Sequence, residues 1–364
     1  MIKKILFWIV ASILTFIPVT IVLLFAWRVY VKESYRGLTA MPTKGVESVE
    51  TVTLGGMEQT VLLRGQLRSS PVLLYIGDAV WLPTLSVARE IGTNTGLEQR
   101  FIVAYWEQRE TGISFSGKSK PEAMTVDQYV ADARDLLRWL KKKYKQDKIY
   151  VMGNGWGSVI GLQLAAKYPE EISAYIGSGQ IVDFRKNDDL AHQFATDHAV
   201  AAQDKSALQD ILALGQPPYD DKKEQLLRKA VATYTTAKAE KTYGFITPAM
   251  NRIFFSTDYS FGNLFTVTRS NEYALKQLWN EKLYALNLAT TVKKISVPVF
   301  FIHGKNDVVS FPQPLEEYFA TLEAPAGKKI TWLEQAGHYP EIEEPVELKN
   351  LIAHQVLPKP PLSP

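Results

Sequence analysis

The 364-residue chain contains no cysteine. This absence excludes disulfide bonds, thiol catalysis and zinc sites built on thiolates. The chain also lacks a strong excess of one charge, because 41 lysines and arginines against 38 aspartates and glutamates give a formal net charge of +3. No block of like charge exceeds Lys141–Lys143, which suits the solvated C-terminal end of a helix. The composition therefore gives no sign of a nucleic-acid-binding surface.

The longest apolar run lies at the N-terminus, from Ile5 to Trp27, and carries no charge. As a helix it would be about 34 Å long, enough to cross the hydrocarbon core of a bilayer. Trp8 and Trp27 lie near its two ends, as interfacial tryptophans do. A cleaved signal peptide is the alternative, but the run is too long and no small-residue cleavage site follows it. We therefore predict a single-pass membrane anchor at residues 1–28.

The charges that flank this run do not decide its orientation. Two lysines precede it, and Arg28, Lys32 and Arg36 follow it, so the positive-inside comparison nearly ties. An N-terminal anchor followed by one large domain favours an extracytoplasmic position for that domain. The polar, mixed segment 29–45 is predicted to be a short tether between the two.

Beyond the tether, apolar runs of strand length alternate with segments of helix length. Buried strands are predicted at residues 71–78, 101–108, 148–153, 174–180, 297–304 and 329–337, after a hairpin around Gly55 and Gly56. This alternation is typical of a parallel sheet flanked by helices. The best-marked helix begins after Thr125, which forms a predicted capping box with Gln128 ahead of an apolar stripe.

The alternation stops at residues 183–292, where helical segments and an aromatic-rich stretch at 253–265 occur without strand-like runs. A helical insertion of this size within a sheet domain is typical of a lid over the carboxyl ends of the strands. We therefore assign residues 46–182 and 293–356 to the sheet core, 183–292 to the lid and 357–364 to a proline-rich tail.

Four short stretches carry patterns that belong together. They are "YWEQRETGIS" after the strand at 101–108, "GNGWGS" after the strand at 148–153, "GKND" after the strand at 297–304, and "EQAGHYP" near the end. Together they resemble the α/β-hydrolase fold and, within it, the proline-iminopeptidase-like branch, which carries D-Q-R-G-x-G-x-S and G-H-S-W-G-S in the first two places. The resemblance covers about residues 46 to 356 and implies small peptides or amides as substrates.

The resemblance places two members of a catalytic triad. In this fold the chain order is nucleophile, acid and histidine. Asp307 in "GKND" matches the acid, and His338 in "AGHYP" matches the histidine, which the acid would hold in one tautomer. A loop-capping aspartate and a packed histidine are the structural alternatives. The other histidines match no motif and are predicted to be structural or surface residues: His192, His198, His303 and His354.

The third member, the nucleophile, is missing. The expected pattern G-x-S-x-G reads Gly153, Asn154, Gly155, Trp156 and Gly157 in this chain. Gly155 therefore occupies the nucleophile position and cannot form an acyl-enzyme. No other G-x-S-x-G occurs, and Ser158 is predicted to lie on the following helix, facing away from the turn.

The oxyanion hole is also degraded. The branch carries H-G-G-P-G after its third strand, where this chain has "GDAVW". The backbone N–H of Trp156 would supply one donor, and the loop around Ala79 should supply the other, but Asp78 there would repel a developing negative charge. The next motif has changed too, with Glu107 for its aspartate and Glu110 for its first glycine.

These losses lead to a functional prediction. Loss of a triad nucleophile costs about a millionfold in turnover, roughly 8 kcal/mol, and a spoiled oxyanion hole costs about 3 kcal/mol more. We therefore predict a membrane-anchored pseudoenzyme that binds a small peptide- or amide-like ligand or a protein partner, with no cofactor, metal or nucleic acid. Five aromatic residues could line its pocket, although such clusters more often form plain core: Trp81, Trp156, Phe254, Phe255 and Tyr259.

Three alternatives stay open on the sequence. The pair of His338 and Asp307 could act as a general base without a nucleophile. Gly155 could be an engineered change in an active peptidase or esterase, although four motif segments depart from the branch rather than one residue. The glycine turn could bind a dinucleotide, with Asp183 on the ribose, although its spacing is not G-x-G-x-x-G.

Overall fold

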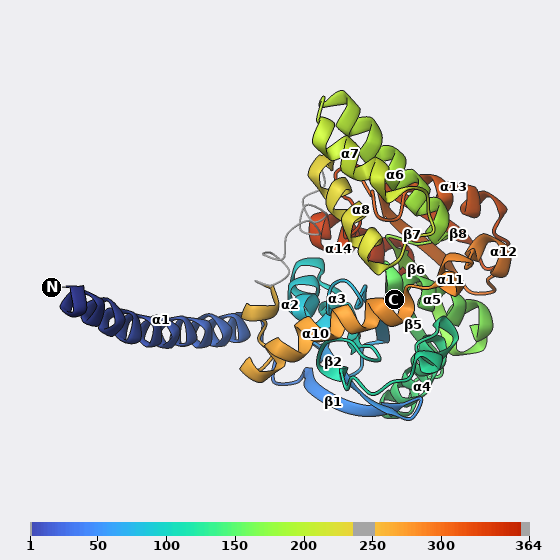
Figure 1. Ribbon diagram of the computed structural model, residues 1–364. Coiled ribbons are helices and arrows are strands. Elements are labelled where there is room, and N and C mark those ends of the chain that lie inside the picture. The colour runs from blue at the N-terminus through green and yellow to red at the C-terminus, as the bar shows by residue number, and fades with distance from the viewer. Residues whose placement is uncertain (1, 236–251, 358–364) are drawn as a thin grey trace.

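The computed structural model describes residues 2–235 and 252–357, which surround a central eight-stranded sheet (Figure 1). Its strands are β1 (Val46–Leu54), β2 (Met57–Gly65), β3 (Val72–Ile76), β4 (Ile102–Glu107), β5 (Ile149–Asn154), β6 (Ile172–Ser178), β7 (Val299–Gly304) and β8 (Lys328–Leu333). They lie in the order β1-β2-β4-β3-β5-β6-β7-β8. β2 pairs antiparallel with β1 and β4, and the remaining pairs are parallel. The predicted α/β-hydrolase sheet, with its leading hairpin, is confirmed.

Helices flank this sheet and extend beyond it. They are α1 (Ile2–Leu38), α2 (Thr84–Thr95), α3 (Leu97–Arg100), α4 (Val126–Tyr144), α5 (Trp156–Lys167), α6 (Phe184–Ala201), α7 (Lys205–Leu214), α8 (Asp221–Tyr234), α10 (Phe261–Leu278), α11 (Glu281–Tyr284), α12 (Leu288–Thr291), α13 (Pro312–Thr321), α14 (Pro340–Glu343) and α15 (Pro345–Leu351). Short turns of tighter or wider helix are η1 (Gly112–Ser114), η2 (Pro121–Ala123), η3 (Pro169–Glu171) and η5 (Ile352–Val356).

The two faces of the sheet are buried against different helices. On one face, Leu74 and Val151 pack in a core that includes α4, α5 and α13. On the other face, Leu73 and Met152 pack against α2 and α15. Successive strand residues point to opposite faces, so a strand that is covered on both sides reads as a continuous apolar run.

The predicted start of α4 is confirmed, but the predicted capping box is only half formed. The Thr125 hydroxyl accepts a hydrogen bond from the Gln128 backbone N–H at 3.3 Å. The Gln128 side chain does not return to the cap, because its amide donates instead to Asp132 at 2.8 Å. The carboxylate of Asp132, one turn further along the helix, is a stronger acceptor for the Gln128 amide than any group at the cap.

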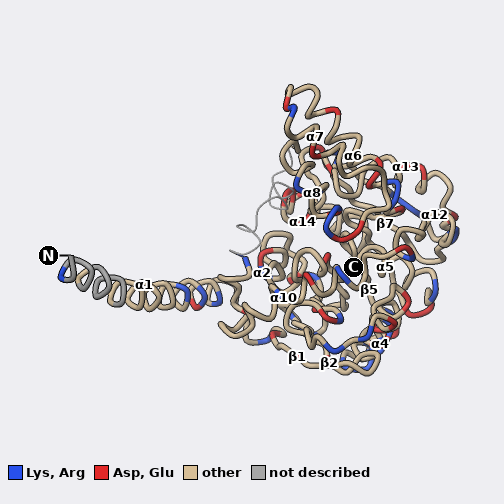
Figure 2. Tube along the Cα trace, viewed as in Figure 1, with Lys and Arg blue, Asp and Glu red and all other residues tan. Residues whose placement is uncertain are grey.

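The N-terminal helix is longer than the sequence suggested. α1 continues to Leu38, so most of the predicted tether at 29–45 is helical, because no glycine or proline interrupts this segment before Gly37. Within the described residues, the part at Thr15–Leu38 is long and apolar enough to cross a membrane by length and composition. Figure 2 shows that the charged residues of this part gather next to the sheet domain, after an uncharged stretch.

The described part of the predicted lid is helical. It contains α6, α7, α8, α10, α11 and α12, and α6 to α8 share a small core that includes Ala195, Ile211 and Leu227. Within the described residues, its β-structure is limited to one isolated bridge between Asp183 and Asn287. Residues 236–251 of the lid and 358–364 of the proline-rich tail lie outside the described residues.

Candidate functional site

The turn between β5 and α5 has the form of a nucleophile elbow that carries no nucleophile. Gly155 has φ 53° and ψ −122°, a conformation that residues with side chains rarely adopt. Gly157 lets α5 cross β3 closely, because a Cβ there would lie 1.9 Å from the Ile76 carbonyl oxygen. A side chain at position 155 would carry strain of about 1–3 kcal/mol, which glycine avoids.

The acid and the histidine predicted from the sequence lie together and are buried. Asp307 follows β7, His338 follows β8, and Nδ1 of the imidazole lies 3.0 Å from the carboxylate Oδ2. The other oxygen of Asp307 accepts the backbone N–H groups of Val309 and Ser310 at 2.9 and 2.8 Å. The Ser310 hydroxyl donates to Asp307 at 2.6 Å and lies 3.0 Å from His338 Nδ1. The sequence analysis missed Ser310, although its spacing of three residues from Asp307 is that of an Asx turn.

A second carboxylate occupies the other side of the imidazole. Asp78, in the loop after β3, has Oδ2 at 3.7 Å from His338 Nε2. The same oxygen accepts the Tyr339 hydroxyl at 2.9 Å, and Oδ1 accepts the Trp156 backbone N–H at 2.9 Å. This N–H is the one donor of the predicted oxyanion hole that the sequence retains, and the Asp78 carboxylate now fills it.

Asp78 also fills the space of the missing side chain. A Cβ built on Gly155 would lie 2.6 Å from Asp78 Cγ and 2.7 Å from His338 Nε2. The sequence analysis predicted that Asp78 would repel a developing negative charge. In the structure its carboxylate lies where the nucleophile and the oxyanion would both have to be.

These neighbours change how the two triad residues titrate. Burial alone would lower the pKa of His338, but the carboxylates of Asp307 and Asp78 outweigh burial and raise this pKa well above its usual value. Burial alone would raise the pKa of Asp307, but His338 lowers it to about 2. The imidazole lies between two carboxylates, which favour its charged form. An imidazolium has no lone pair with which to accept a proton.

The cluster has little space for a ligand. His338 has no exposed surface, and Asp78 is 3% exposed. A void that touches Asp78, beside Tyr75 and Tyr339, has a volume of about 10 Å³. This volume is at the lower limit for a single water molecule. Because His338 and Asp78 are buried, a peptide or an ester would have to displace neighbouring groups to contact them.

The two glutamates that replace motif residues are structural. Glu107 is buried and accepts the Leu85 backbone N–H and the Tyr259 hydroxyl at 2.7 and 2.8 Å, and burial raises its pKa. Glu110 has φ 56°, so the backbone keeps the conformation that favours glycine at this position. Its carboxylate accepts four hydrogen bonds from residues 116–119, which outweigh burial and lower its pKa to about 2.

The aromatic residues proposed as a pocket do not line a common space. Trp156 is buried against Tyr129 and donates to Gln108 at 3.0 Å. Trp81 packs against Trp279, at another cavity. Tyr259 is buried on Glu107, whereas Phe254 and Phe255 lie beside α1. That prediction was wrong, because sequence proximity to the elbow and the lid does not fix the direction of a side chain.

The other candidate residues have structural partners. Ser158 lies on α5 as predicted, and its hydroxyl donates to the Gly155 carbonyl oxygen and accepts from the Ile181 N–H, so backbone groups engage it on both sides. Asp183 accepts the Lys186 N–H as the N-cap of α6, a position that gives no support to a ribose site. Ala79 is buried. The buried His303 ring lies 2.7 Å from the Ser310 carbonyl oxygen and 3.3 Å from Asp307.

Comparison with known proteins agrees with this architecture. A family model described as alpha/beta hydrolase fold matches residues 97–345. The probable aminopeptidase YbaC of Bacillus subtilis (strain 168) is 25% identical over 312 residues, which are 85% of this chain and 96% of that protein. A proline iminopeptidase-related protein from Thermus thermophilus has 22% identity and a TM-score of 0.55, with 85% and 98% of the two chains covered. A membrane phospholipase A has 18% identity and a TM-score of 0.50, with 96% and 94% covered.

Proposed function

Because the chain belongs to the alpha/beta hydrolase fold family, we propose that it is a member whose catalytic centre has become a closed ion-pair cluster, and that it acts by binding rather than by hydrolysis. The observation that carries this proposal is the position of Asp78. Its carboxylate accepts the Trp156 N–H at 2.9 Å and lies within 2.6 Å of where a nucleophile's Cβ would be.

Three losses act on the same reaction. The absent nucleophile removes about 8 kcal/mol of transition-state stabilisation. The filled oxyanion donor removes about 3 kcal/mol more, and the negative charge of Asp78 opposes an oxyanion. The protonated state of His338 removes the base. Since each 1.4 kcal/mol is about a factor of ten in rate, residual hydrolysis by the family mechanism falls below detection.

The alternative of a general base without a nucleophile rests on the 3.0 Å contact between His338 and Asp307. A general base has to be unprotonated at working pH and has to reach its proton. His338 meets neither condition, because Asp78 and Asp307 hold it as a cation and the cluster is closed. An engineered loss of serine at position 155 is also disfavoured, because a serine would collide with Asp78.

We propose further that α1 anchors the domain to a membrane, with the domain on the extracytoplasmic side. The uncharged run of α1, from Ile5 to Trp27, is about 34 Å of helix, and the candidate span at Thr15–Leu38 contains its C-terminal half. Most of its large apolar side chains are about half exposed or more, among them Phe16, Val22 and Leu23. Such a surface is unfavourable in water and is expected in lipid. The likeness to a membrane phospholipase A over 96% of this chain adds support.

The ligand class follows from the relatives. YbaC is a probable aminopeptidase, and a structural neighbour is a proline iminopeptidase-related protein. We therefore propose a peptide- or amide-like ligand, or a protein partner that presents such a group. Because the cluster around His338 is closed, this ligand would contact the lid helices or the loops around the cluster rather than the cluster itself.

Turnover tests the proposal. The full-length protein, purified in a non-ionic detergent, is incubated with prolyl and alanyl p-nitroanilides and with p-nitrophenyl butyrate. We expect release of nitroaniline and nitrophenol at the rate of a His338→Gln variant, in which the triad is broken. Turnover by the unaltered protein that His338→Gln abolishes would contradict the proposal. Extraction of cell membranes with alkaline carbonate tests the anchor separately, with retention in the membrane fraction as the expected result.

A further inference from the structure

The end of α1 is attached rigidly to the sheet domain. Arg28 is 3% exposed and donates to the Phe254 and Tyr259 carbonyl oxygens at 2.7 and 3.0 Å. One turn later Lys32 donates to the Tyr259 carbonyl oxygen at 2.9 Å, and a further turn on Arg36 reaches the 254–259 segment as well. Three cations on one helix face thus hold this segment, so the domain has a defined position relative to the helix.

Aromatic residues mark the level of α1 at which a membrane surface would lie. Phe25 contacts Phe261 of α10 with ring centroids 5.8 Å apart, and Trp27 contacts Phe255 at 5.3 Å. Phe261 and Phe265, on the first two turns of α10, are 46% and 68% exposed. Exposed aromatic rings beside an apolar helix suit the membrane–water interface. The N-terminal end of α10 and the 254–259 segment therefore lie at headgroup depth if α1 spans a bilayer.

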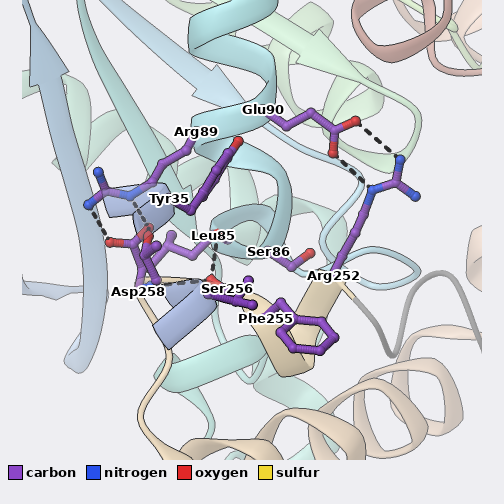
Figure 3. A pocket seen from close by; sticks show the side chains of 11 residues that line it. Tyr35, Leu85, Ser86, Arg89, Glu90, Arg252, Phe255, Ser256 and Asp258 are labelled. Atoms are coloured by element: carbon purple, nitrogen blue, oxygen red, sulfur yellow. Dashed lines mark hydrogen bonds and ion pairs between the residues drawn. The ribbon is translucent and has the colours of Figure 1, made fainter. Parts of the chain in front are cut away.

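A cavity opens directly beyond this level. It has a volume of about 320 Å³ and lies between α1, α2 and the segment at 252–258 (Figure 3). α1 contributes Val31 and Tyr35, which follow Trp27 by one and two turns, about 6 and 12 Å along the helix. Leu85 and Phe255 add apolar surface from the other two walls. The volume is at the lower end of the range of small-molecule sites, about 300–1,000 Å³.

The charges in the cavity wall are not equally available. Arg89 is 6% exposed and is fully engaged, by Asp258 with two contacts of 2.8 Å and by Glu47 at 2.8 Å. Arg252 pairs with Glu90 at 3.0 and 3.3 Å, and these side chains are 25% and 30% exposed. Figure 3 shows this second pair on the opposite side of the cavity from the first. A partly exposed ion pair contributes about 0–1 kcal/mol, so an incoming anion can replace Glu90 on Arg252 at little cost.

We propose that this cavity binds a single-chain lipid with an anionic headgroup, such as a fatty acid, taken from the adjoining membrane. The headgroup would pair with Arg252, and the chain would lie against Val31, Leu85 and Phe255. The source of the ligand rests on the membrane anchor proposed above. The site itself rests on the cavity, on its apolar walls and on the exchangeable cation at its edge.

Native mass spectrometry of the full-length protein in a non-ionic detergent tests the site. The probes are hexadecanoate, the neutral hexadecanol and the short anion acetate. Arg252→Gln removes the cation, and Ser86→Phe fills the cavity from α2. Arg138→Gln is the matched control, because this arginine lies on α4, which packs on the opposite face of the sheet, and is 54% exposed. Thermal unfolding checks that each variant is folded, and Val31→Trp replaces Ser86→Phe if the latter unfolds.

We expect one equivalent of hexadecanoate on the unaltered protein and on Arg138→Gln. Arg252→Gln should weaken hexadecanoate about tenfold and leave hexadecanol unchanged, and Ser86→Phe should weaken both at least tenfold. Unchanged binding in Arg252→Gln and Ser86→Phe would overturn the proposal, as would acetate binding that matches hexadecanoate. Hexadecanoate binding in detergent does not need a bilayer. The binding experiment therefore tests the cavity, and carbonate extraction tests the membrane anchor, so the failure of one can be told from the failure of the other.

Discussion

Replacement of Gly155 by serine restores the nucleophile pattern of the family, yet we expect it to destabilise the fold without restoring hydrolysis. The new Cβ would lie 2.6 Å from Asp78 Cγ and 2.7 Å from His338 Nε2, closer than real side chains approach. The φ of 53° adds strain of about 1–3 kcal/mol. Displacement of Asp78 breaks its two 2.9 Å hydrogen bonds, each worth about 1.5–3 kcal/mol for a charged acceptor. The lower ends of these ranges give a loss of about 4 kcal/mol.

A double-mutant cycle in urea separates the collision from the strain. In an Asp78→Gly background the collision is absent, so Gly155→Ser should cost only the strain of about 1–3 kcal/mol. A fluorophosphonate probe should leave the single variant unlabelled, because Asp307 still raises the pKa of His338 and His338 is buried. A Gly155→Ser protein that is as stable as the unaltered one, and that reacts with the probe, would refute this account of Asp78.

Three further results are expected. The pKa of His338 lies above the unfolded value of about 6.5, so its ion pairs stabilise the fold fully below that pH and lose this effect as pH rises through the folded value. As pH rises above the unfolded value of about 6.5, the Tm should therefore fall more steeply than in His338→Gln, and equal slopes would argue against the cation. Glu110→Gln weakens four hydrogen bonds from residues 116–119, so urea unfolding should show a free energy of unfolding lower by about 1–3 kcal/mol. An unchanged free energy would mean that other contacts fix the loop at 116–119. Arg28→Gln should speed amide hydrogen exchange in residues 254–260 and leave β5 unaffected, and unaltered exchange would show that α1 is loosely attached.

The fold could be predicted because its elements are marked by short, continuous patterns in the sequence. Continuous apolar runs identified the strands of the parallel sheet, and a glycine-rich corner after β5 identified the elbow. Chain order and the motifs "GKND" and "AGHYP" together paired Asp307 with His338, whose side chains lie 3.0 Å apart although the residues are 31 positions apart in the chain. These features repeat in any chain with this topology, so a pattern is sufficient to find them.

The closure of the site could not be predicted, because it depends on where one side chain points. Asp78 follows β3, and its hydrogen bonds reach Trp156 and Tyr339, which lie far from it in the chain. A short change in the loop after β3 would direct the same carboxylate to solvent. Ser310 was missed for a different reason. A serine a few positions after an aspartate is common in sequences, and only the contact of its hydroxyl with His338 shows that Ser310 belongs to the site. The helical tether was missed because its polar composition outweighed its lack of helix-breaking residues.

The charge state of His338 is the most direct test of the claim that the catalytic centre has become an ion-pair cluster. Ring nitrogen chemical shifts of the ¹⁵N-labelled full-length protein at neutral pH, assigned by comparison with His338→Gln, report whether each nitrogen carries a proton. We expect both nitrogens of this ring to be protonated, one facing Asp307 and one facing Asp78. A neutral ring with an unprotonated Nε2 would contradict the account, because that nitrogen is the base that a working hydrolase needs.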